Sequence, residues 1–406
     1  MMKGRLAVVQ SGGPTPVINA SLVGIIHEAQ QHDCFDKIYG LIHGIEGGLK
    51  REMIDLSSLT ARQLQTLANT PAAALRSSRH KISDDDYEII LECCRAHHIH
   101  YFACIGGNGS MYVCNRLAEM AQAANYELRV VGVPKTIDND LLHTDHTPGY
   151  GSAARFLALA TRDTGLDLRA MATFDDVTIL EALGRNAGWL AAATALAVQH
   201  DDDAPHLIYV PEVAFDERRF LNDVVAVHER LGYVFVVVSE GLRDAEGRMI
   251  GQRESNHAEH VDTLGRSIYS LSQGVASYLA ELVREQLGLQ ARTLRPGLIG
   301  RAMSAAVSSV DRVEARRVGE AATTYLADGG SGEMITLERI SQQPYHCDTG
   351  TIELSVVSGG EKMLPREYIN NAGNMMTAAF IDYVRPLIGE LPPVFRFDAD
   401  KNHFDG

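Results

Sequence analysis

Short apolar segments and longer amphipathic segments alternate along this chain, and polar or glycine-containing loops separate them. Runs of apolar residues predict buried strands, which we place at 6–10, 37–41, 100–105, 130–133, 177–182, 206–210 and 233–238. Helical periodicity predicts helices, which we place at 17–30, 87–97, 111–125, 153–162, 189–199, 267–287 and 311–326. Because strands and helices alternate, we expect an α/β fold with parallel sheets covered by helices on both faces.

Two of the predicted strands run into glycine turns that lead directly into a helix. Gly12-Gly13 follows the first strand, and Gly106-Gly107-Asn108-Gly109-Ser110 follows the strand at 100–105. Such a turn places backbone N–H groups at a helix N-terminus, where an anion such as phosphate binds. We expect Ser110 to cap the second helix. The second turn has neither the lysine of a P-loop nor the spacing of a dinucleotide-binding fingerprint.

The strand at 130–133 leads into the most informative loop, Pro134-Lys135-Thr136-Ile137-Asp138-Asn139-Asp140. Proline ends the strand, and ligands of open α/β sheets bind beyond the carboxyl ends of strands. Phosphoryl transfer to an alcohol needs a carboxylate, which acts as a base, beside a cation. The carboxylate takes the hydroxyl proton, and the ammonium balances charge on the phosphoryl group. Taken alone, the loop is equally consistent with a charged surface loop that has no catalytic role.

Two later strands also end in residues suited to a phosphorylated sugar. Arg185 follows the strand at 177–182, and Glu240 follows the strand at 233–238. A guanidinium binds phosphate through two parallel hydrogen bonds, whereas a carboxylate accepts hydrogen bonds from sugar hydroxyls. Together the strand ends predict phosphoryl transfer between a phosphate donor and a phosphorylated polyol. The alternative is a Rossmann-like binding protein without catalysis.

Composition narrows the class of protein further. The 406 residues are 45% hydrophobic and 22% charged, which is typical of a globular protein with two or more domains. The net charge of −15 argues against nucleic acid or an anionic membrane as the main partner. The six cysteines form no CxxC pair, and no apolar run approaches the ~20 residues of a membrane span. We therefore expect a cytoplasmic protein with reduced thiols.

In these motifs the chain resembles the phosphofructokinase family. The likeness runs from Gly12-Gly13-Pro14 to Arg301, and Thr136-Ile137-Asp138-Asn139-Asp140 is its most specific part. The resemblance implies two Rossmann-like lobes, each with a mostly parallel, doubly wound sheet, and an active site in the cleft between them. We place approximate boundaries at 1–140 for the donor-phosphate lobe, 141–310 for the sugar-phosphate lobe and 311–406 for the closing segments, with later segments returning to the first lobe.

The resemblance also implies roles for individual residues. Asp138 would deprotonate the 1-hydroxyl of fructose 6-phosphate in this step of glycolysis, while Thr136 would position the sugar and Lys135 would stabilise charge on the phosphate. The residues implied for the donor phosphates are Gly13, Arg79, Gly107, Asn108, Gly109 and Ser110. Those implied for the sugar phosphate are Thr136, Asp138, Leu183, Gly184, Arg185, Glu240, Arg292, Leu298 and Arg301. Arg292 would reach in from a neighbouring subunit of a homodimer or homotetramer, and Mg²⁺ would lie near Asn108 with Asp140 assisting.

Residues that distinguish pyrophosphate users from ATP users in this family disagree here. Lys135 and Asn108 resemble the pyrophosphate-using branch, whereas Gly109 resembles ATP users, because pyrophosphate users typically carry aspartate there. Arg76 stands where relatives often have glycine, and this bulky cation disfavours a nucleotide. We therefore expect pyrophosphate as the donor, with ATP as the alternative.

Two departures from the family pattern keep other functions open. Asn108 replaces a frequent aspartate, which weakens magnesium binding, and Gly300 replaces a frequent glutamine before Arg301. A catalytically silent sugar-phosphate-binding regulator therefore stays an alternative, although Asp138 and Lys135 count against it. A kinase for sedoheptulose 7-phosphate is a third possibility, since both ketoses present the same reacting end.

Overall fold

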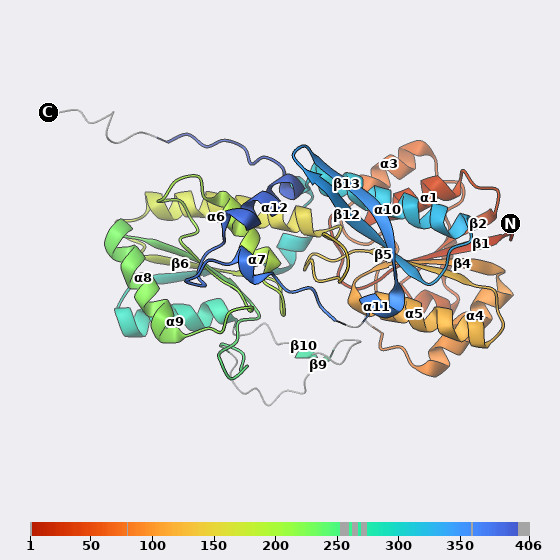
Figure 1. The fold of residues 1–406 in the computed structure, drawn as a ribbon, viewed down its shortest axis with the longest axis horizontal. Helices are drawn as coiled ribbons and strands as arrows, with labels where there is room; N and C mark the ends of the chain where they lie inside the picture. The colour runs from red at the N-terminus through yellow and green to blue at the C-terminus, as the bar shows by residue number, and fades with distance from the viewer. Residues whose placement is uncertain are drawn as a thin grey trace.

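A computed structural model describes residues 2–78, 80–251, 260–261, 267–268, 274–358 and 360–396. These residues form two α/β lobes that lie side by side (Figure 1). The sheet of the first lobe contains β1 (Gly4–Gln10), β2 (Phe35–Leu41), β3 (Met53–Asp55), β4 (Ile99–Gly106), β5 (Arg129–Pro134), β12 (Glu333–Gln342) and β13 (Tyr345–Glu353). The sheet of the second lobe contains β6 (Val177–Ala182), β7 (Leu207–Tyr209), β8 (Val234–Ser239) and β11 (Ala291–Leu294). A small antiparallel pair joins β9 (His260–Val261) and β10 (Ser267–Ile268).

The strand order is β13-β12-β5-β4-β1-β2-β3 in the first sheet and β11-β6-β8-β7 in the second. Most neighbouring strands are parallel, which confirms the predicted fold class, while β3 and β13 at the edges run antiparallel to β2 and β12. The carboxyl ends of β1, β4 and β5 therefore lie next to one another. This adjacency brings the two glycine turns and the Lys135 loop to one edge of the sheet.

Helices cover both faces of the first sheet (Figure 1). One face carries α1 (Ile18–Ala29), α3 (Ala61–Asn69) and α10 (Ser309–Ala327), and the other carries α2 (Glu46–Lys50), α4 (Asp84–Ala96), α5 (Asn108–Ala123) and α11 (Leu354–Val357). Side chains of a strand alternate between faces, so Leu6 packs with α1 and α10 while Ala7 packs with α4 and α5. Gly319 lets α10 approach α1 closely, since a Cβ there would lie 2.1 Å from the carbonyl oxygen of Ser21.

The second sheet is covered in the same way (Figure 1). One face carries α6 (Tyr150–Ala170), α7 (Trp189–Ala193), η1 (Thr194–Ala197) and α12 (Ala378–Ile388), and the other carries α8 (Glu217–Leu231) and α9 (Val275–Leu287). Short 3-10 turns form η2 (Gly297–Arg301), η3 (Ser304–Ala306) and η4 (Arg366–Tyr368). Among the described residues, no helix combines the length and hydropathy that crossing a bilayer requires. Segments after residue 310 divide between the lobes, because α10, β12 and β13 pack with the first lobe and α12 packs with the second. The lobe boundaries at 140 and 310 stay a prediction.

Two predicted helix starts are wrong. The helix expected from residue 267 begins at Val275 instead, and residues 267–268 form β10, while residues 269–273 lie outside the described chain. Ser110 does not cap α5, because Gly107 is the N-cap and Ser110 lies inside the first turn. The Ser110 side chain packs against the preceding turn, where a Cβ on Gly106 would come within 2.0 Å of its hydroxyl oxygen.

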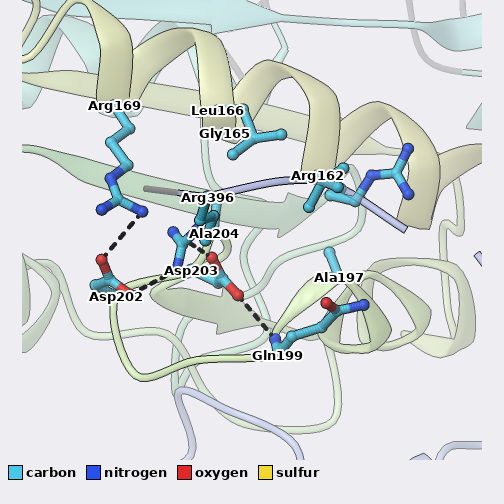
Figure 2. Close-up of a pocket in the computed structure, with 11 residues that line it drawn as sticks. Arg162, Gly165, Leu166, Arg169, Ala197, Gln199, Asp202, Asp203, Ala204 and Arg396 are labelled. Carbon is cyan, nitrogen blue, oxygen red and sulfur yellow. Dashed lines mark hydrogen bonds and ion pairs between the residues drawn. The ribbon is translucent and has the colours of Figure 1, made fainter. Parts of the chain in front are cut away.

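Hydrogen bonds and ion pairs of arginine side chains hold the segment after α12 against the second lobe. Arg155 on α6 donates hydrogen bonds to the carbonyl oxygens of Ile388 and Glu390, each at 2.7 Å. Figure 2 shows a small cavity beside this segment, where Arg396 pairs with Asp202 at 3.0 Å and with Asp203 at 2.6 Å. The residues that line this cavity include none of those predicted for the phosphoryl-transfer site. We infer that these ion pairs and hydrogen bonds anchor the C-terminal segment to the second lobe.

A buried ionic network joins the loop after Asp140 to the C-terminal strands. His146 binds Asp145 at 2.8 Å through Nδ1 and Glu314 of α10 at 2.6 Å through Nε2, and Arg339 of β12 binds Asp145 at 2.9 Å. Cys347 lies beside His146 and Glu314, and the potential ligand atoms of these three residues lie within 4.8 Å of one another. Because both nitrogens of His146 already have carboxylate partners, we interpret the cluster as structural.

This network predicts a pH-dependent stability. Although burial lowers the pKa of His146, hydrogen bonds to Asp145 and Glu314 outweigh it and raise that pKa from 6.5 to about 9. The imidazolium therefore contributes stability that is complete below the unfolded pKa and is lost as the pH rises through 9. We expect the free energy of unfolding in urea to fall by up to about 3 kcal/mol across this window. His146→Gln should remove that decline, whereas the exposed His346→Gln should keep it; parallel pH profiles for wild type and His146→Gln would contradict the assignment.

Candidate active site

A buried lysine joins three strand ends of the first sheet. Nζ of Lys135 donates hydrogen bonds to the carbonyl oxygens of Ser11 at 2.8 Å and Gly13 at 2.7 Å, in the turn after β1. The backbone N–H of Lys135 donates to the carbonyl oxygen of Gly106 at 3.0 Å, at the end of β4. Only 2% of Lys135 is exposed. The lysine loop and the two glycine turns therefore form one continuous surface at the sheet edge.

The pKa of Lys135 is lowered toward neutral pH. Burial lowers the pKa of Lys135 from 10.5 to about 8, with the carboxylate of Asp138 acting in the opposite direction. The ammonium is thus mostly protonated at neutral pH. It places a positive charge directly beneath the turns that are expected to bind phosphate.

Asn108, the first residue of α5, lies against the end of the Asp138 loop. Its side-chain Nδ2 donates a hydrogen bond to Oδ2 of Asp140 at 2.9 Å, and its Oδ1 is buried without a hydrogen-bond partner. A buried polar atom without a partner suggests a ligand, and amide and carboxylate oxygens are what Mg²⁺ prefers. The two residues predicted for the metal therefore lie together and fit a magnesium ion.

Asp138 lies where the two lobes meet. Burial, then the charge of Glu240, raises the pKa of Asp138 from 3.8 to about 6, and the cations Arg185 and Lys135 oppose that rise. Lys135 belongs to the first lobe, whereas Arg185 and Glu240 follow β6 and β8 of the second. The structure thus brings the predicted base, the predicted ammonium and the two predicted sugar-binding residues into one electrostatic cluster.

The second-lobe side of this cluster is shaped by Gly184 and Glu240. Gly184 has a φ of 124°, a conformation that favours glycine, and its N–H donates a hydrogen bond to Oε1 of Glu240 at 3.2 Å. Its carbonyl oxygen accepts a hydrogen bond from the hydroxyl of Ser239 at 2.6 Å. Burial raises the pKa of Glu240, which the Gly184 N–H partly offsets. The loop after β6 is therefore held against the end of β8.

The family of the chain follows from comparison with known proteins. A family model described as phosphofructokinase matches residues 5–326. The chain belongs to the phosphofructokinase family.

Several relatives match nearly the whole length of the chain. A pyrophosphate–fructose 6-phosphate 1-phosphotransferase of Xanthomonas campestris is 39% identical over 406 residues, covering 98% of this chain and 95% of that protein. A sulfofructose kinase of Alkalicoccus urumqiensis is 34% identical over 391 residues, covering 96% of this chain and 97% of that protein. A crystal structure of a pyrophosphate-dependent phosphofructokinase from Marinobacter aquaeolei has 36% identity and a TM-score of 0.86, covering 97% and 94% of the two chains. The chain is thus a phosphotransferase of the phosphofructokinase type.

Arg301 reaches from η2 toward the residues predicted to bind the donor. A Cβ on Gly13 would lie 3.1 Å from Nη1 of Arg301, and the charge of this guanidinium helps to lower the pKa of Lys135, after the larger effect of burial. Leu298 lies in the same turn and is 59% exposed. Arg301 therefore stands at the boundary between the residues predicted for the donor and those predicted for the sugar.

A further predicted residue, Arg292, lies away from this site. Arg292 pairs along β11 with Thr178 at the amino end of β6, and its guanidinium binds Asp175 at 2.8 Å. It lies at the opposite end of the sheet from Gly184, so its contribution to a neighbouring subunit's site stays a prediction. Arg79 lies outside the described residues.

Two residues near the site escaped the sequence analysis. Glu361 accepts a hydrogen bond from Nδ2 of Asn186 at 2.8 Å, beside Arg185, and the backbone N–H of Lys362 donates to the carbonyl oxygen of Asp140 at 2.8 Å. Both lie far along the chain from the strand ends that they touch. The adjacent acid and base at 361–362 look like an ordinary surface pair in the sequence, so no local signal identifies them.

Proposed function

We propose that this protein transfers a phosphoryl group from pyrophosphate to the 1-hydroxyl of fructose 6-phosphate, a reaction of glycolysis. The single observation that carries the proposal is the cluster around Asp138, in which a carboxylate with a raised pKa faces Lys135 and Arg185. The names of relatives that match nearly the full chain support pyrophosphate as donor and fructose 6-phosphate as acceptor.

In the proposed reaction, the carboxylate of Asp138 accepts the proton of the 1-hydroxyl while that oxygen attacks the terminal phosphorus of pyrophosphate. The bond from this phosphorus to the bridging oxygen breaks, and inorganic phosphate leaves. A base with a pKa of about 6 is mostly ionised at neutral pH and still able to accept a proton in the transition state. Lys135 and the backbone N–H groups at the start of α5 offset the negative charge of the phosphates.

We assign the surrounding residues to the two substrates in the same proposal. The donor phosphates are bound by Gly13, Arg79, Gly107, Asn108, Gly109 and Ser110. The sugar phosphate is bound by Thr136, Leu183, Gly184, Arg185, Glu240, Leu298 and Arg301, with Arg292 from a neighbouring subunit of a homodimer or homotetramer. Magnesium held by Asn108 and Asp140 would screen the charge on the donor oxygens.

The local structure at the donor turn supports pyrophosphate. Arg76 adopts a φ of 63°, and its Nη1 lies 3.1 Å from Nε2 of His43. The next residue, Ser77, donates a hydrogen bond to the carbonyl oxygen of Gly12 at 2.6 Å. Arg76 therefore adds bulk and positive charge next to the first glycine turn, which favours a small, highly charged anion.

We expect kcat/KM for pyrophosphate to exceed that for ATP by about tenfold or more, or about 1.4 kcal/mol in the transition state. Side-by-side donor kinetics with fructose 6-phosphate and Mg²⁺ provide the measurement. Gly109→Asp should abolish any residual use of ATP while sparing pyrophosphate. A clear preference for ATP in the wild-type enzyme would overturn the donor assignment.

The acceptor is tested in the same assay. Because one relative is a sulfofructose kinase and Gly300 replaces a frequent glutamine beside Arg301, the panel includes a sulfonated ketose and sedoheptulose 7-phosphate. The proposal requires fructose 6-phosphate to have the highest kcat/KM of the three. Absence of turnover with every acceptor would favour a regulatory sugar-phosphate-binding protein.

A further inference from the structure

One extended segment passes from the first lobe to the second across both active-site loops. The chain leaves α11 in the first lobe and reaches η4 in the second (Figure 1). We call residues 360–364 the strap. No part of the donor or sugar site assigned above lies in it.

On the first-lobe side, the strap binds the loop that follows Asp138. The backbone N–H of Lys362 donates to the carbonyl oxygen of Asp140 at 2.8 Å. Nζ of Lys362 donates to the carbonyl oxygens of Thr144 at 3.0 Å and Asp145 at 2.6 Å. One residue thus holds both ends of the turn that carries Asp140.

On the second-lobe side, the strap binds the loop that carries Arg185. Glu361 accepts a hydrogen bond from Nδ2 of Asn186 at 2.8 Å, and the carbonyl oxygen of Lys362 accepts one from Nε1 of Trp189 at 2.9 Å. The N–H of Leu364 donates to Oε1 of Glu212 at 2.9 Å. The same carboxylate oxygen accepts the N–H of Gly188 at 2.9 Å. The strap is therefore tied to the Arg185 loop through three separate hydrogen-bonded connections.

Burying the charged side chain of Lys362 in the strap costs desolvation free energy. Burial lowers the pKa of Lys362 from 10.5 to about 8, and a desolvated ammonium destabilises a protein unless it is well compensated. Here the compensation comes from two carbonyl oxygens and from the ring of Trp189, whose centroid lies 4.9 Å from Nζ. An apolar side chain would avoid this penalty but could not bind the Asp140 loop.

We propose that the strap holds the Asp138–Asp140 loop against the Gly184–Asn186 loop, and that Glu361 and Lys362 are positioning residues for phosphoryl transfer. The proposal rests on the function proposed above. The base and the sugar-binding residues come from different lobes, so their separation depends on what connects the two loops. A strap bonded to both fixes that separation before substrates bind.

The test compares Lys362→Met and Glu361→Ala with the wild-type enzyme. Misplacement of reacting groups by about 1 Å costs up to ~10²-fold in rate, so we expect kcat to fall 10- to 100-fold per folded molecule. KM for both substrates should stay within about threefold, because the binding groups themselves are unchanged. Glu361→Gln keeps an oxygen to accept from Asn186 and should restore most of kcat. Met363→Ala is the matched control, since Met363 lies in the same strap but is 44% exposed.

Amide hydrogen exchange provides a second readout that needs no substrate. In Lys362→Met, exchange should accelerate in 138–145 and in 184–188 together. Acceleration confined to the strap, or an unchanged kcat per folded molecule in both variants, would overturn the proposal. If the wild-type enzyme fails to phosphorylate fructose 6-phosphate from pyrophosphate, the proposed function is wrong, and the exchange measurement still decides whether the strap couples the loops.

Discussion

Replacing Asp138 by asparagine is expected to lower kcat by roughly 10²- to 10⁴-fold, the usual contribution of a general base. Asparagine preserves the shape of the side chain but cannot accept the proton of the sugar hydroxyl at neutral pH. The buried carboxylate lies between Glu240, Arg185 and Lys135, and the last two residues stay in place in the variant. Steady-state kinetics with fructose 6-phosphate and pyrophosphate measure the effect.

Binding of fructose 6-phosphate should change far less than turnover in this variant. Removing one negative charge beside Glu240 makes the pocket more favourable to an anionic sugar, so calorimetry should show equal or tighter binding. Asp163→Asn is a suitable control, because it makes the same chemical change at an aspartate of α6 whose side chain is 61% exposed. A kcat near that of the wild type in Asp138→Asn would remove Asp138 from its assigned role.

Replacing Lys135 by methionine is expected to lower kcat by roughly 10²- to 10³-fold, as the loss of a preorganised charge-stabilising group typically does. The methionine fills a similar volume but supplies no positive charge beneath the phosphate turns. It also leaves the carbonyl oxygens of Ser11 and Gly13 without the donor that now satisfies them. Each buried group left unpaired costs about 1–3 kcal/mol, so a lower melting temperature should accompany the loss of rate.

The two effects of this substitution can be separated. Kinetics run well below the melting temperature, with the folded fraction measured by circular dichroism, isolate the rate effect from the stability effect. Lys50→Met provides the control, because the Lys50 side chain is 55% exposed and forms its ion pair with Glu46 at the surface. If Lys135→Met turns over normally per folded molecule, the lysine supports the turns and takes no part in transfer.

Much of the fold could be predicted from local patterns. The apolar runs of β1, β4, β5, β6 and β8 identify the central strands, because each of these strands buries side chains on both faces of its sheet. The glycine turns and the acid–lysine loop were also visible, since their chemistry lies in consecutive residues. Parallel pairing then implied that these loops meet at one sheet edge.

The two wrong helix starts have a common physical cause. A local pattern cannot show that the Ser110 hydroxyl packs over Gly106 or that residues 267–268 form a strand. For the same reason it gave no sign of the ion pair between Arg292 and Asp175. Each of these outcomes depends on which groups become neighbours after folding.

The sequence by itself determined the family, the α/β class with its central strands, and the loops that are predicted to carry phosphoryl-transfer chemistry. Only the tertiary structure decided that Lys135 is buried beneath two glycine turns, that Asp138 faces charges from both lobes, and that residues 361–362 connect those lobes. The reason is that secondary structure and turn geometry depend on neighbouring residues. Desolvation, pKa values and the separation of groups more than a hundred residues apart depend on how all the elements pack together.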